Sequence, residues 1–236
     1  MLDLHAHFLP GTDDGAKTVE ESIELLRQMK EQGVTTAVAT PHFFPAFASL
    51  DDFFALREKG ESDLAAAMPD DLGIKIVLGA EVLYFSGIGK IEDIKKLTIA
   101  GGKYLLLELL GLNKIDEKVI NDIRMLSDNL GLVPIIAHAE RYCKYKGYKL
   151  LVSLLEEGAA LCQINATFSE SKSETRAVKK LMEKGLVNFV ASDCHNPKTR
   201  GVKLKEAFSL LREMSPDNTD KIIKETEKLE KELIEL

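Results

Sequence analysis

The sequence predicts an α/β fold in which a parallel sheet closes, or nearly closes, into a barrel. Seven short apolar or β-branched stretches alternate with segments that have a helical apolar period. Several of the strands are almost continuously apolar, as expected for a parallel sheet covered by helices. A doubly wound open sheet is the structural alternative, but the glycine-rich G-x-G-x-x-G turn that follows the first strand of dinucleotide-binding sheets is missing.

The first half of the chain predicts three strands, the first two of them each followed by a helix. The first helix begins at Thr18, with Glu21 placed for a capping box, and ends at Gly33; Ile23, Leu26 and Met29 form its apolar stripe. The β-branched run 35–40 is stopped by Pro41. The strands are expected at 2–5, 35–40 and 74–79, with Glu81 at the end of the third, and the second helix is expected at 50–67.

The second half repeats the alternation and closes with two helices. The strands are expected at 104–109, 133–137, 161–165 and 188–191, and the helices between them at 117–130, 147–157 and 173–184. The last helix is expected from about 218 to 235. Within the segment 221–236, an apolar side predicts packing on the barrel: Ile222, Thr226, Leu229 and Leu233. No linker or low-complexity stretch interrupts the chain, so residues 1–236 are predicted to form one domain.

Composition limits the possible functions. The 236 residues are 45% hydrophobic and 29% charged, which is typical of a globular protein. A net charge of −7 disfavours a broad nucleic-acid-binding face. Three cysteines without a repeated spacing argue against a disulfide framework, and there is neither a signal peptide nor an apolar run of about 20 residues, so we expect a cytoplasmic protein.

All five histidines lie at the predicted carboxyl ends of strands, where α/β barrels carry their functional groups. His5 and His7 are two residues apart on a strand, so their imidazoles point to the same side and could share a metal ion. Asp193-x-His195 repeats that spacing. Glu108 lies inside an apolar run, where a carboxylate requires an exposed strand face, a cation or a metal.

Taken singly, the carboxylates also have simpler explanations. The Asp13-Asp14-Gly15 sequence is a common turn, and Glu81 could be a solvated residue at a strand end. Their common placement with the histidines is what indicates a site.

Five motifs together resemble the polymerase-and-histidinol-phosphatase (PHP) superfamily: His5-x-His7, Thr40-Pro41-His42, Gly79-Ala80-Glu81, His138-x-Glu140-Arg141 and Ser192-Asp193-x-His195. Members of this superfamily are distorted seven-stranded α/β barrels with up to three metal ions at the carboxyl ends of the strands. Within it, the loop 9–15 and the carboxylate Glu108 resemble the bacterial manganese-dependent protein-tyrosine phosphatases of capsule and exopolysaccharide clusters. The resemblance covers essentially the whole chain, with the motifs in the family's order.

The resemblance implies nine metal ligands: His5, His7, Asp14, His42, Glu81, Glu108, His138, Asp193 and His195. It implies three ions, the first on His5, His7, Glu81 and Asp193, the second on Glu81, Glu108 and His138, and the third on Asp14, His42 and His195. Imidazole and carboxylate ligands without thiolate suit Mn²⁺, with iron or Zn²⁺ as alternatives.

The activity that the resemblance implies is metal-dependent removal of phosphate from phosphotyrosine on a protein, with a bacterial tyrosine kinase of polysaccharide synthesis as the expected partner. It places Arg141 and Arg200 at the pocket mouth, where they would hold phosphate oxygens. Two alternatives stay open. The same fold could act on a small molecule such as histidinol phosphate or a nucleotide, or the chain could be a non-catalytic metal-binding partner of a kinase.

Two further sequence patterns each allow two interpretations. Cys194 and Arg200 satisfy the Cys-x5-Arg spacing of thiol-based tyrosine phosphatases, but the intervening residues include Pro197 and no glycine. This competing reading would also leave the histidines unexplained. Phe43, Phe44 and Phe47 could line a groove for an aromatic substrate or could pack within their loop.

Overall fold

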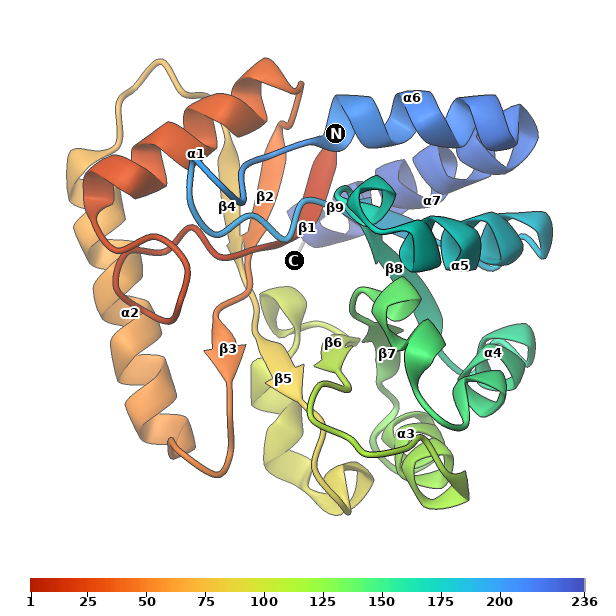
Figure 1. Cartoon of the computed structure of the whole chain (residues 1–236). Helices are drawn as coiled ribbons and strands as arrows, with labels where there is room; N and C mark the ends of the chain where they lie inside the picture. Colours follow the sequence, from red (N-terminus) through yellow and green to blue (C-terminus); the bar gives the residue numbers. More distant parts are fainter. Residues whose placement is uncertain (236) are drawn as a thin grey trace.

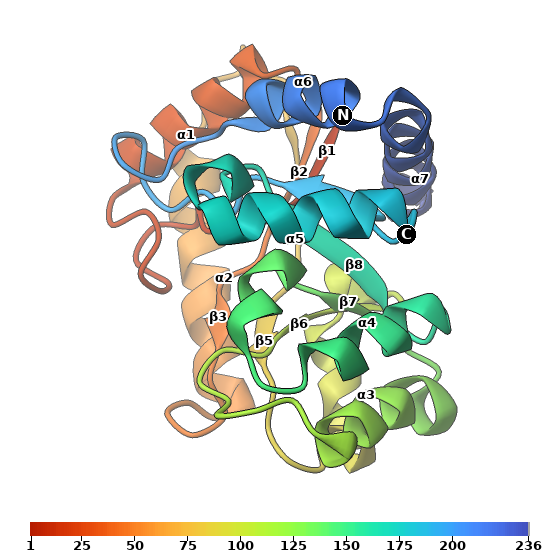
Figure 2. The ribbon, with the colours of Figure 1, turned by 45° about the vertical axis from the view of Figure 1, so that its right-hand side comes forward.

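The computed structural model describes residues 1–235 and places the strands at the centre of the molecule, surrounded by helices (Figures 1 and 2). The strands are β1 (Leu2–Ala6), β2 (Thr36–Ala39), β3 (His42–Phe43), β4 (Lys75–Leu78), β5 (Glu81–Leu83), β6 (Tyr104–Glu108), β7 (Val133–Ile136), β8 (Leu161–Asn165) and β9 (Phe189–Ala191). The α-helices are α1 (Val19–Glu31), α2 (Leu50–Ala67), α3 (Glu117–Leu130), α4 (Tyr148–Glu156), α5 (Lys172–Glu183), α6 (Leu204–Met214) and α7 (Pro216–Glu235). Short 3₁₀ helices lie at Ile88–Lys90, Glu92–Leu97, Ile99–Gly101, Ala139–Lys144 and Phe168–Glu170.

The strands form two parallel sheets. The first strand of the chain, in one sheet, lies next to the segment that follows the last strand, in the other. One sheet has the order β1-β2-β4 and the other β3-β5-β6-β7-β8-β9. Beyond the strand ends, Ala6 pairs with Cys194 in an isolated parallel bridge. The His7 amide donates to the Cys194 carbonyl and the Asp193 amide donates to the His5 carbonyl, both at 2.9 Å. The first strand therefore lies beside the segment that follows the last strand.

The α/β class and the parallel pairing are confirmed, and each of the seven predicted strands has a counterpart. The structure adds two short strands, β3 after Pro41 and β5 after Ala80, where the chain passes from the smaller sheet to the larger one. The expectation that Glu81 ends the third strand was wrong. Glu81 begins β5, because it pairs in parallel register with His42 of β3.

The predicted helices are present within a few residues, and α2 has the predicted bounds. At α1, the Thr18 side chain accepts from the Glu21 amide, as a helix cap should. The reciprocal half of the predicted capping box is shifted by one residue, since Glu21 Oε2 accepts from the Lys17 amide at 2.8 Å. Leu25 is buried on this helix, whereas Ile23 is only partly buried.

A small apolar group, which we call the inner core, fills the space between the strands and one side of α7. It draws on both sheets and on the last helix: Leu2, Leu4, Val38, Val77, Ile99, Leu106, Ile135, Ala137, Phe189, Ala191, Leu229 and Leu233. The predicted apolar side of α7 is confirmed, because Ile222, Thr226, Leu229 and Leu233 are buried. Residue 236, at the end of the predicted segment, lies outside the described residues. A second, larger apolar group packs the other helices onto the strands.

Within residues 1–235, none of the helices combines the length and the apolar character that crossing a membrane requires.

A candidate metal centre

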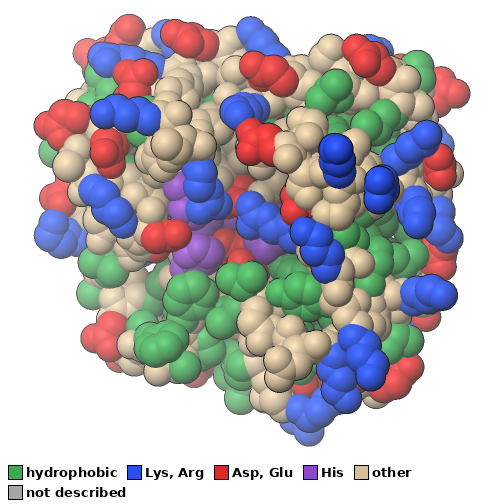
Figure 3. Space-filling model, in the orientation of Figure 1, with side chains coloured by type: hydrophobic (Ala, Val, Ile, Leu, Met, Phe, Trp, Pro, Cys, Tyr) green, Lys and Arg blue, Asp and Glu red, His purple; other side chains and the backbone are tan. Residues whose placement is uncertain are grey.

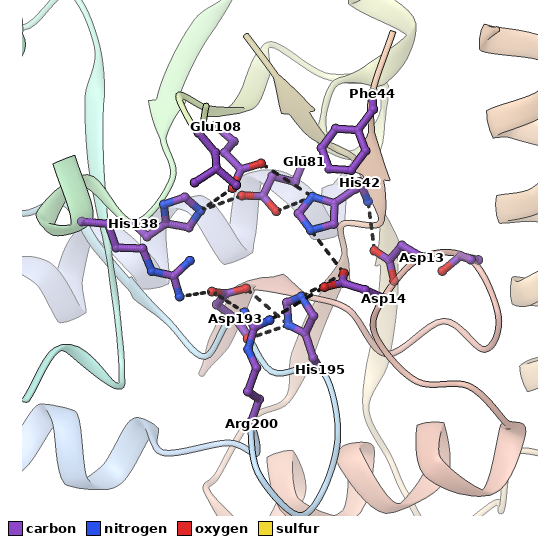
Figure 4. Close-up of a pocket in the computed structure, with 13 residues that line it drawn as sticks. Asp13, Asp14, His42, Phe44, Glu81, Glu108, His138, Asp193, His195 and Arg200 are labelled. Atoms are coloured by element: carbon purple, nitrogen blue, oxygen red, sulfur yellow. Dashed lines mark hydrogen bonds and ion pairs between the residues drawn. The ribbon is translucent and has the colours of Figure 1, made fainter. Parts of the chain in front are cut away.

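A cavity of about 450 Å³ opens where the strands end, and the predicted site residues converge on it (Figure 4). Seven of the nine predicted ligands line it: Asp14, His42, Glu81, Glu108, His138, Asp193 and His195. His5 and His7 lie buried beside them, with Nε2 atoms 3.1 Å apart. Each of those Nε2 atoms faces Glu81 Oε2, at 3.1 Å from His5 and 3.2 Å from His7. The structure thus brings all nine residues together, although they come from segments far apart in the chain.

Three overlapping groups of donor atoms are close enough to hold a cation, with all atoms of a group within 4.8 Å of one another. The groups are His7, Asp14, His42 and His195; His5, His7 and Glu81; and His42, Glu81 and Glu108. His138 adjoins the last group, because its Nε2 lies 2.9 Å from Glu81 Oε1 and 3.2 Å from Glu108 Oε1. Asp193 Oδ1 lies 3.6 Å from His5 Nε2 and 3.5 Å from His7 Nε2.

Four of the five imidazoles are oriented by a partner on Nδ1, which leaves Nε2 facing the other site residues. A hydrogen bond at one ring nitrogen fixes the tautomer and directs the other nitrogen, which is the usual arrangement of metal-binding histidines. The pairs are His5 with Gln163 Oε1 at 3.1 Å, His7 with Asp13 Oδ2 at 2.6 Å, His138 with Tyr142 Oη at 3.1 Å and His195 with the Asp193 carbonyl at 2.9 Å.

A polar relay on β8 links these histidines to Asp193. Gln163 Oε1 also accepts from the His138 amide at 2.8 Å, and its Nε2 donates to Asn165 Oδ1 at 2.9 Å. Asn165 Nδ2 donates in turn to Asp193 Oδ2 at 2.6 Å. All of these groups are buried, so each hydrogen bond is made in a medium that strengthens it and penalises its loss.

The buried carboxylates and imidazoles of the site shift one another's pKa values. Burial raises the pKa of Glu81, but the charge of His5, the hydrogen bond to His138 and the nearby imidazole of His42 lower it well below its ordinary value. Burial lowers the pKa of His138, but hydrogen bonds to Glu108 and Glu81 raise it to about 9. A buried carboxylate that stays ionised requires positive charge beside it, which protonated imidazoles or a divalent cation can supply.

Several nitrogen and oxygen atoms in the cavity that could bind a metal make no hydrogen bond within residues 1–235. They are His42 Nδ1, Glu81 Oε2, Glu108 Oε2 and His195 Nε2, all of them buried. Buried polar atoms are normally satisfied, so a group of unsatisfied ones calls for an explanation. Imidazole and carboxylate donors without a thiolate fit Mn²⁺, iron or Zn²⁺, and a cation of this kind would satisfy these atoms.

The backbone around the cavity is held in unusual conformations. His138 and Asp193 have φ values of 33° and 49°, in the left-handed region that non-glycine residues rarely adopt. Such residues gather at functional sites, where the surrounding structure imposes the conformation. Gly15 is required for another reason, since a Cβ there would lie 2.1 Å from the His7 carbonyl oxygen.

Arg141 and Arg200 meet at one oxygen of Asp193. Their Nη2 atoms donate to Asp193 Oδ2 at 2.8 Å and 3.1 Å, and both side chains line the cavity. Arg200 also lies near Asp14, with 4.0 Å between Nη1 and Oδ2. Figure 3 shows Lys and Arg side chains on one side of the histidines and hydrophobic side chains on the opposite side.

The alternative of a cysteine nucleophile does not fit the structure. Cys194 is fully buried, and burial raises the pKa of its thiol, which opposes formation of the reactive thiolate. The segment from Cys194 to Arg200 also leads into no helix N-terminus, because the next helix, α6, begins at Leu204. A phosphate-binding loop of the thiol-based kind is therefore absent at this position.

The three phenylalanines of the 43–47 segment have three different environments. Phe43 is buried and packs edge-on against Phe53, with ring centroids 5.3 Å apart. Phe44 lines the cavity and stacks on His42, with centroids 4.8 Å apart. Phe47 is 87% exposed.

Sequence reasoning missed the residues that orient the histidines. Asp13 was treated as part of a turn, and Gln163, Asn165 and Tyr142 were not singled out. One signal was available: Gln163 and Asn165 are two residues apart in a strand that is otherwise apolar, which puts both on one face. Tyr142 has no comparable signature, because its contact with His138 depends on the 3₁₀ helix at Ala139–Lys144.

The chain is similar to a family of capsular polysaccharide synthesis and to several tyrosine-protein phosphatases. The family model described as capsular polysaccharide synthesis, CpsB/CapC, matches residues 1–229. The tyrosine-protein phosphatase YwqE of Bacillus subtilis is 31% identical over 220 residues, covering 89% of this chain and 84% of YwqE. The tyrosine-protein phosphatase CpsB of Streptococcus pneumoniae is 30% identical over 250 residues, covering 94% of this chain and 98% of CpsB.

The chain is also similar in fold to solved phosphatase structures. A crystal structure from work on YwqE and CpsB, described as unique metal-dependent tyrosine phosphatases, has a TM-score of 0.78 and 26% identity, covering 96% of this chain and 93% of that chain. A histidinol phosphate phosphatase from Lactococcus lactis, solved with zinc, histidinol and phosphate, has a TM-score of 0.52 at 14% identity and covers 91% of this chain and 93% of its own, which shows a shared fold. Since the family model spans nearly the whole sequence, the chain belongs to the CpsB/CapC family of capsular polysaccharide synthesis.

Proposed function

We propose that this protein is a metal-dependent tyrosine phosphatase that removes phosphate from phosphotyrosine on a protein. The observation that carries the proposal is the convergence of five histidines and four carboxylates on one cavity, with two arginines at its mouth. The phosphatase names of the relatives support the same activity.

We propose that the nine converging residues are the metal ligands and that Mn²⁺ is the resident ion, with three ions bound. Oriented Nε2 atoms and buried unsatisfied donors support this assignment. Bound divalent ions would neutralise the phosphate charge and supply a strong nucleophile near neutral pH by lowering the pKa of water. Glu81 lies between the donor groups and is the residue best placed to serve more than one ion.

The arginines would hold the substrate. Arg141 and Arg200 point at one carboxylate oxygen, Asp193 Oδ2, so each guanidinium keeps further N–H donors for phosphate oxygens. Asp193 fixes their position before substrate arrives, which lowers the cost of organising them. The phenolate of tyrosine is a good leaving group, so the reaction depends less on a general acid than hydrolysis of an alkyl phosphate would.

The finer fold assignment is also a proposal. We infer that the two sheets are one distorted seven-stranded barrel of the PHP type in a single domain. In it, β2 with β3 and β4 with β5 would each form one interrupted strand. The inner core supports this, because it draws on both sheets, and so does the bridge between Ala6 and Cys194.

The expected substrate is a bacterial tyrosine kinase of polysaccharide synthesis; the family description supports only the process, capsular polysaccharide synthesis. Incubation of the purified protein with such a phosphorylated kinase, followed by anti-phosphotyrosine detection, would test this. Equal or better turnover of histidinol phosphate or a nucleotide would favour the small-molecule alternative instead.

The activity itself is tested with a phosphotyrosine peptide. Chelation should abolish turnover and added Mn²⁺ should restore it, while Cys194→Ser should retain it. Turnover that survives complete removal of metal but is lost in Cys194→Ser would refute the proposal.

A further inference from the structure

One side of the cavity mouth is apolar, although the cavity itself is lined by charged groups. Phe44 follows β3 and Leu110 follows β6, in the first half of the larger sheet, whereas the cavity-lining Arg141 and Arg200 follow β7 and β9 in its second half. The same division is visible in Figure 3, where hydrophobic side chains lie on one side of the histidines and basic ones on the other. We call Phe44 and Leu110 the apolar wall.

Packing into the apolar core does not account for either residue of the apolar wall. Leu110 is 54% exposed, although the preceding Leu109 and the strand residues Leu105 to Leu107 are completely buried. Phe44 faces the cavity, whereas its neighbour Phe43 packs into the core against Phe53. Exposed apolar side chains at the edge of a cavity are typical of ligand sites, where a few polar groups fix orientation and apolar groups contact the rest of the molecule.

The apolar wall cannot bind the phosphate group. Phenyl and isobutyl side chains make no hydrogen bonds with phosphate oxygens, which the arginines and the metal site would hold. These side chains can make favourable contacts only with the apolar part of the substrate, which is attached to the phosphate and lies at the cavity mouth when the phosphate is bound. The Phe44 ring is also already held in place, since it stacks on His42 at an interplanar angle of 20°, and a fixed ring face suits stacking by another aromatic ring.

We propose that Phe44 and Leu110 are specificity-determining residues that bind the aromatic ring of the phosphoester and select aryl over alkyl phosphates. This inference rests on the proposed phosphatase function and names the part of the chain that recognises the tyrosyl group. A phosphoserine side chain has no ring to place against this wall, so it would lack the apolar contact.

The test compares Phe44→Ala and Leu110→Ala with two matched controls. Phe47→Ala removes an 87% exposed phenylalanine from the same segment, and Leu56→Ala removes a 44% exposed leucine from α2; neither lines the cavity. Turnover of phenyl phosphate and the inhibition constant of inorganic phosphate are measured for each variant, together with its manganese content. Inorganic phosphate serves as the probe without a ring.

For each wall variant, kcat/KM for phenyl phosphate should fall roughly tenfold, as expected for lost apolar contacts in a binding pocket. The inhibition constant of inorganic phosphate and the manganese content should stay unchanged, and both controls should behave like the wild type. A parallel loss of phosphate inhibition or of manganese would overturn the inference, because it would mean that the wall supports the metal centre instead. Unchanged kcat/KM in both wall variants would also overturn it.

The wild-type measurement separates this inference from the proposed function. A wild-type protein that hydrolyses no aryl phosphate with Mn²⁺ present contradicts the phosphatase proposal and the wall together. An active wild type with unaffected wall variants contradicts the wall alone.

Discussion

His7 and Asp13 are joined by a short buried contact, with 2.6 Å between Nδ1 of the imidazole and Oδ2 of the carboxylate. The same oxygen accepts from the His42 amide at 3.0 Å, and Asp13 Oδ1 accepts from the Gly15 amide at 2.8 Å. Every position on this carboxylate therefore faces a donor. Asp13 orients one histidine and anchors the segment that carries another.

Replacing Asp13 with asparagine should damage the metal site, because either orientation of the amide turns an NH₂ group toward an N–H donor. We expect metal affinity or activity to fall roughly 10- to 100-fold, as is usual when a partner of a metal-binding histidine is lost. Titration of the metal-free variant with Mn²⁺ measures the effect. Asp63→Asn, at an exposed pair with Lys59 on α2, is the control. Equal affinities in the two variants would show that Asp13 has no orienting role.

Gln163→Met should destabilise the protein even without metal. Methionine has a similar length but cannot accept hydrogen bonds, so the buried His138 amide and His5 Nδ1 would lose their shared acceptor. Leaving a buried donor unsatisfied costs about 1–3 kcal/mol of unfolding free energy. Urea denaturation in the presence of a chelator measures it, and a stability equal to that of the wild type would contradict the relay described for β8.

Gly15→Ala should distort the loop that carries Asp13 and Asp14. The new Cβ would lie 2.1 Å from the His7 carbonyl and 2.6 Å from its Cβ, and the backbone cannot give way without moving His7. Gly73→Ala is the comparison, since φ is +64° there but no atom lies within 4 Å. That control should cost only the left-handed backbone strain, roughly 1–2 kcal/mol. Thermal melting and manganese content of both variants test the difference, which should be larger for Gly15→Ala in each assay.

The metal-free protein should lose stability as the pH rises, partly because of Glu140. Burial raises the pKa of this carboxyl to about 7 from the ordinary value of 4.5. The folded state then holds a proton that the unfolded state has released, so stability declines between these values as pH increases. His138, with its pKa raised to about 9, adds stability below pH 6.5 that is lost as the pH approaches 9.

Glu140→Gln isolates the first of these effects. Glutamine cannot ionise and its oxygen can still accept from the Asn165 amide, as Glu140 Oε1 does at 3.1 Å. The variant should therefore gain stability over the wild type as the pH rises from 5 to 8, by on the order of 2 kcal/mol. Urea denaturation of both proteins with a chelator present at the two pH values measures the difference. A difference that stays constant or shrinks over this range would contradict the assignment.

Much of the fold could be predicted because its elements carry strong local signals. The helix α2 is bounded as expected because Ser49 and Asp52 form a capping box at its start. The strands β3 and β5 could not be predicted, since each has only two or three residues and exists because it pairs with its neighbour across the sheet. Glu81 is therefore the first residue of β5 and not, as expected, the end of the preceding strand.

The site divides in the same way. The five histidines could be found because all of them lie at predicted strand ends, whereas the full set of nine residues was implied by the resemblance to the PHP superfamily. The residues that orient them could not, because hydrogen bonds such as that between Tyr142 and His138 arise from tertiary structure. Phe44 illustrates the limit, since only the packing of Phe43 against Phe53 distinguishes the two neighbours.

We propose that one cavity at the strand ends holds divalent ions on the nine converging residues. Anomalous diffraction at the manganese edge, from crystals of the protein loaded with Mn²⁺, tests it most directly. We expect three anomalous peaks in the cavity, each within bonding distance of histidine nitrogens or carboxylate oxygens, with Glu81 shared between ions. A cavity without anomalous density, or ions held by other residues while His5 and His7 remain unbound, would contradict it.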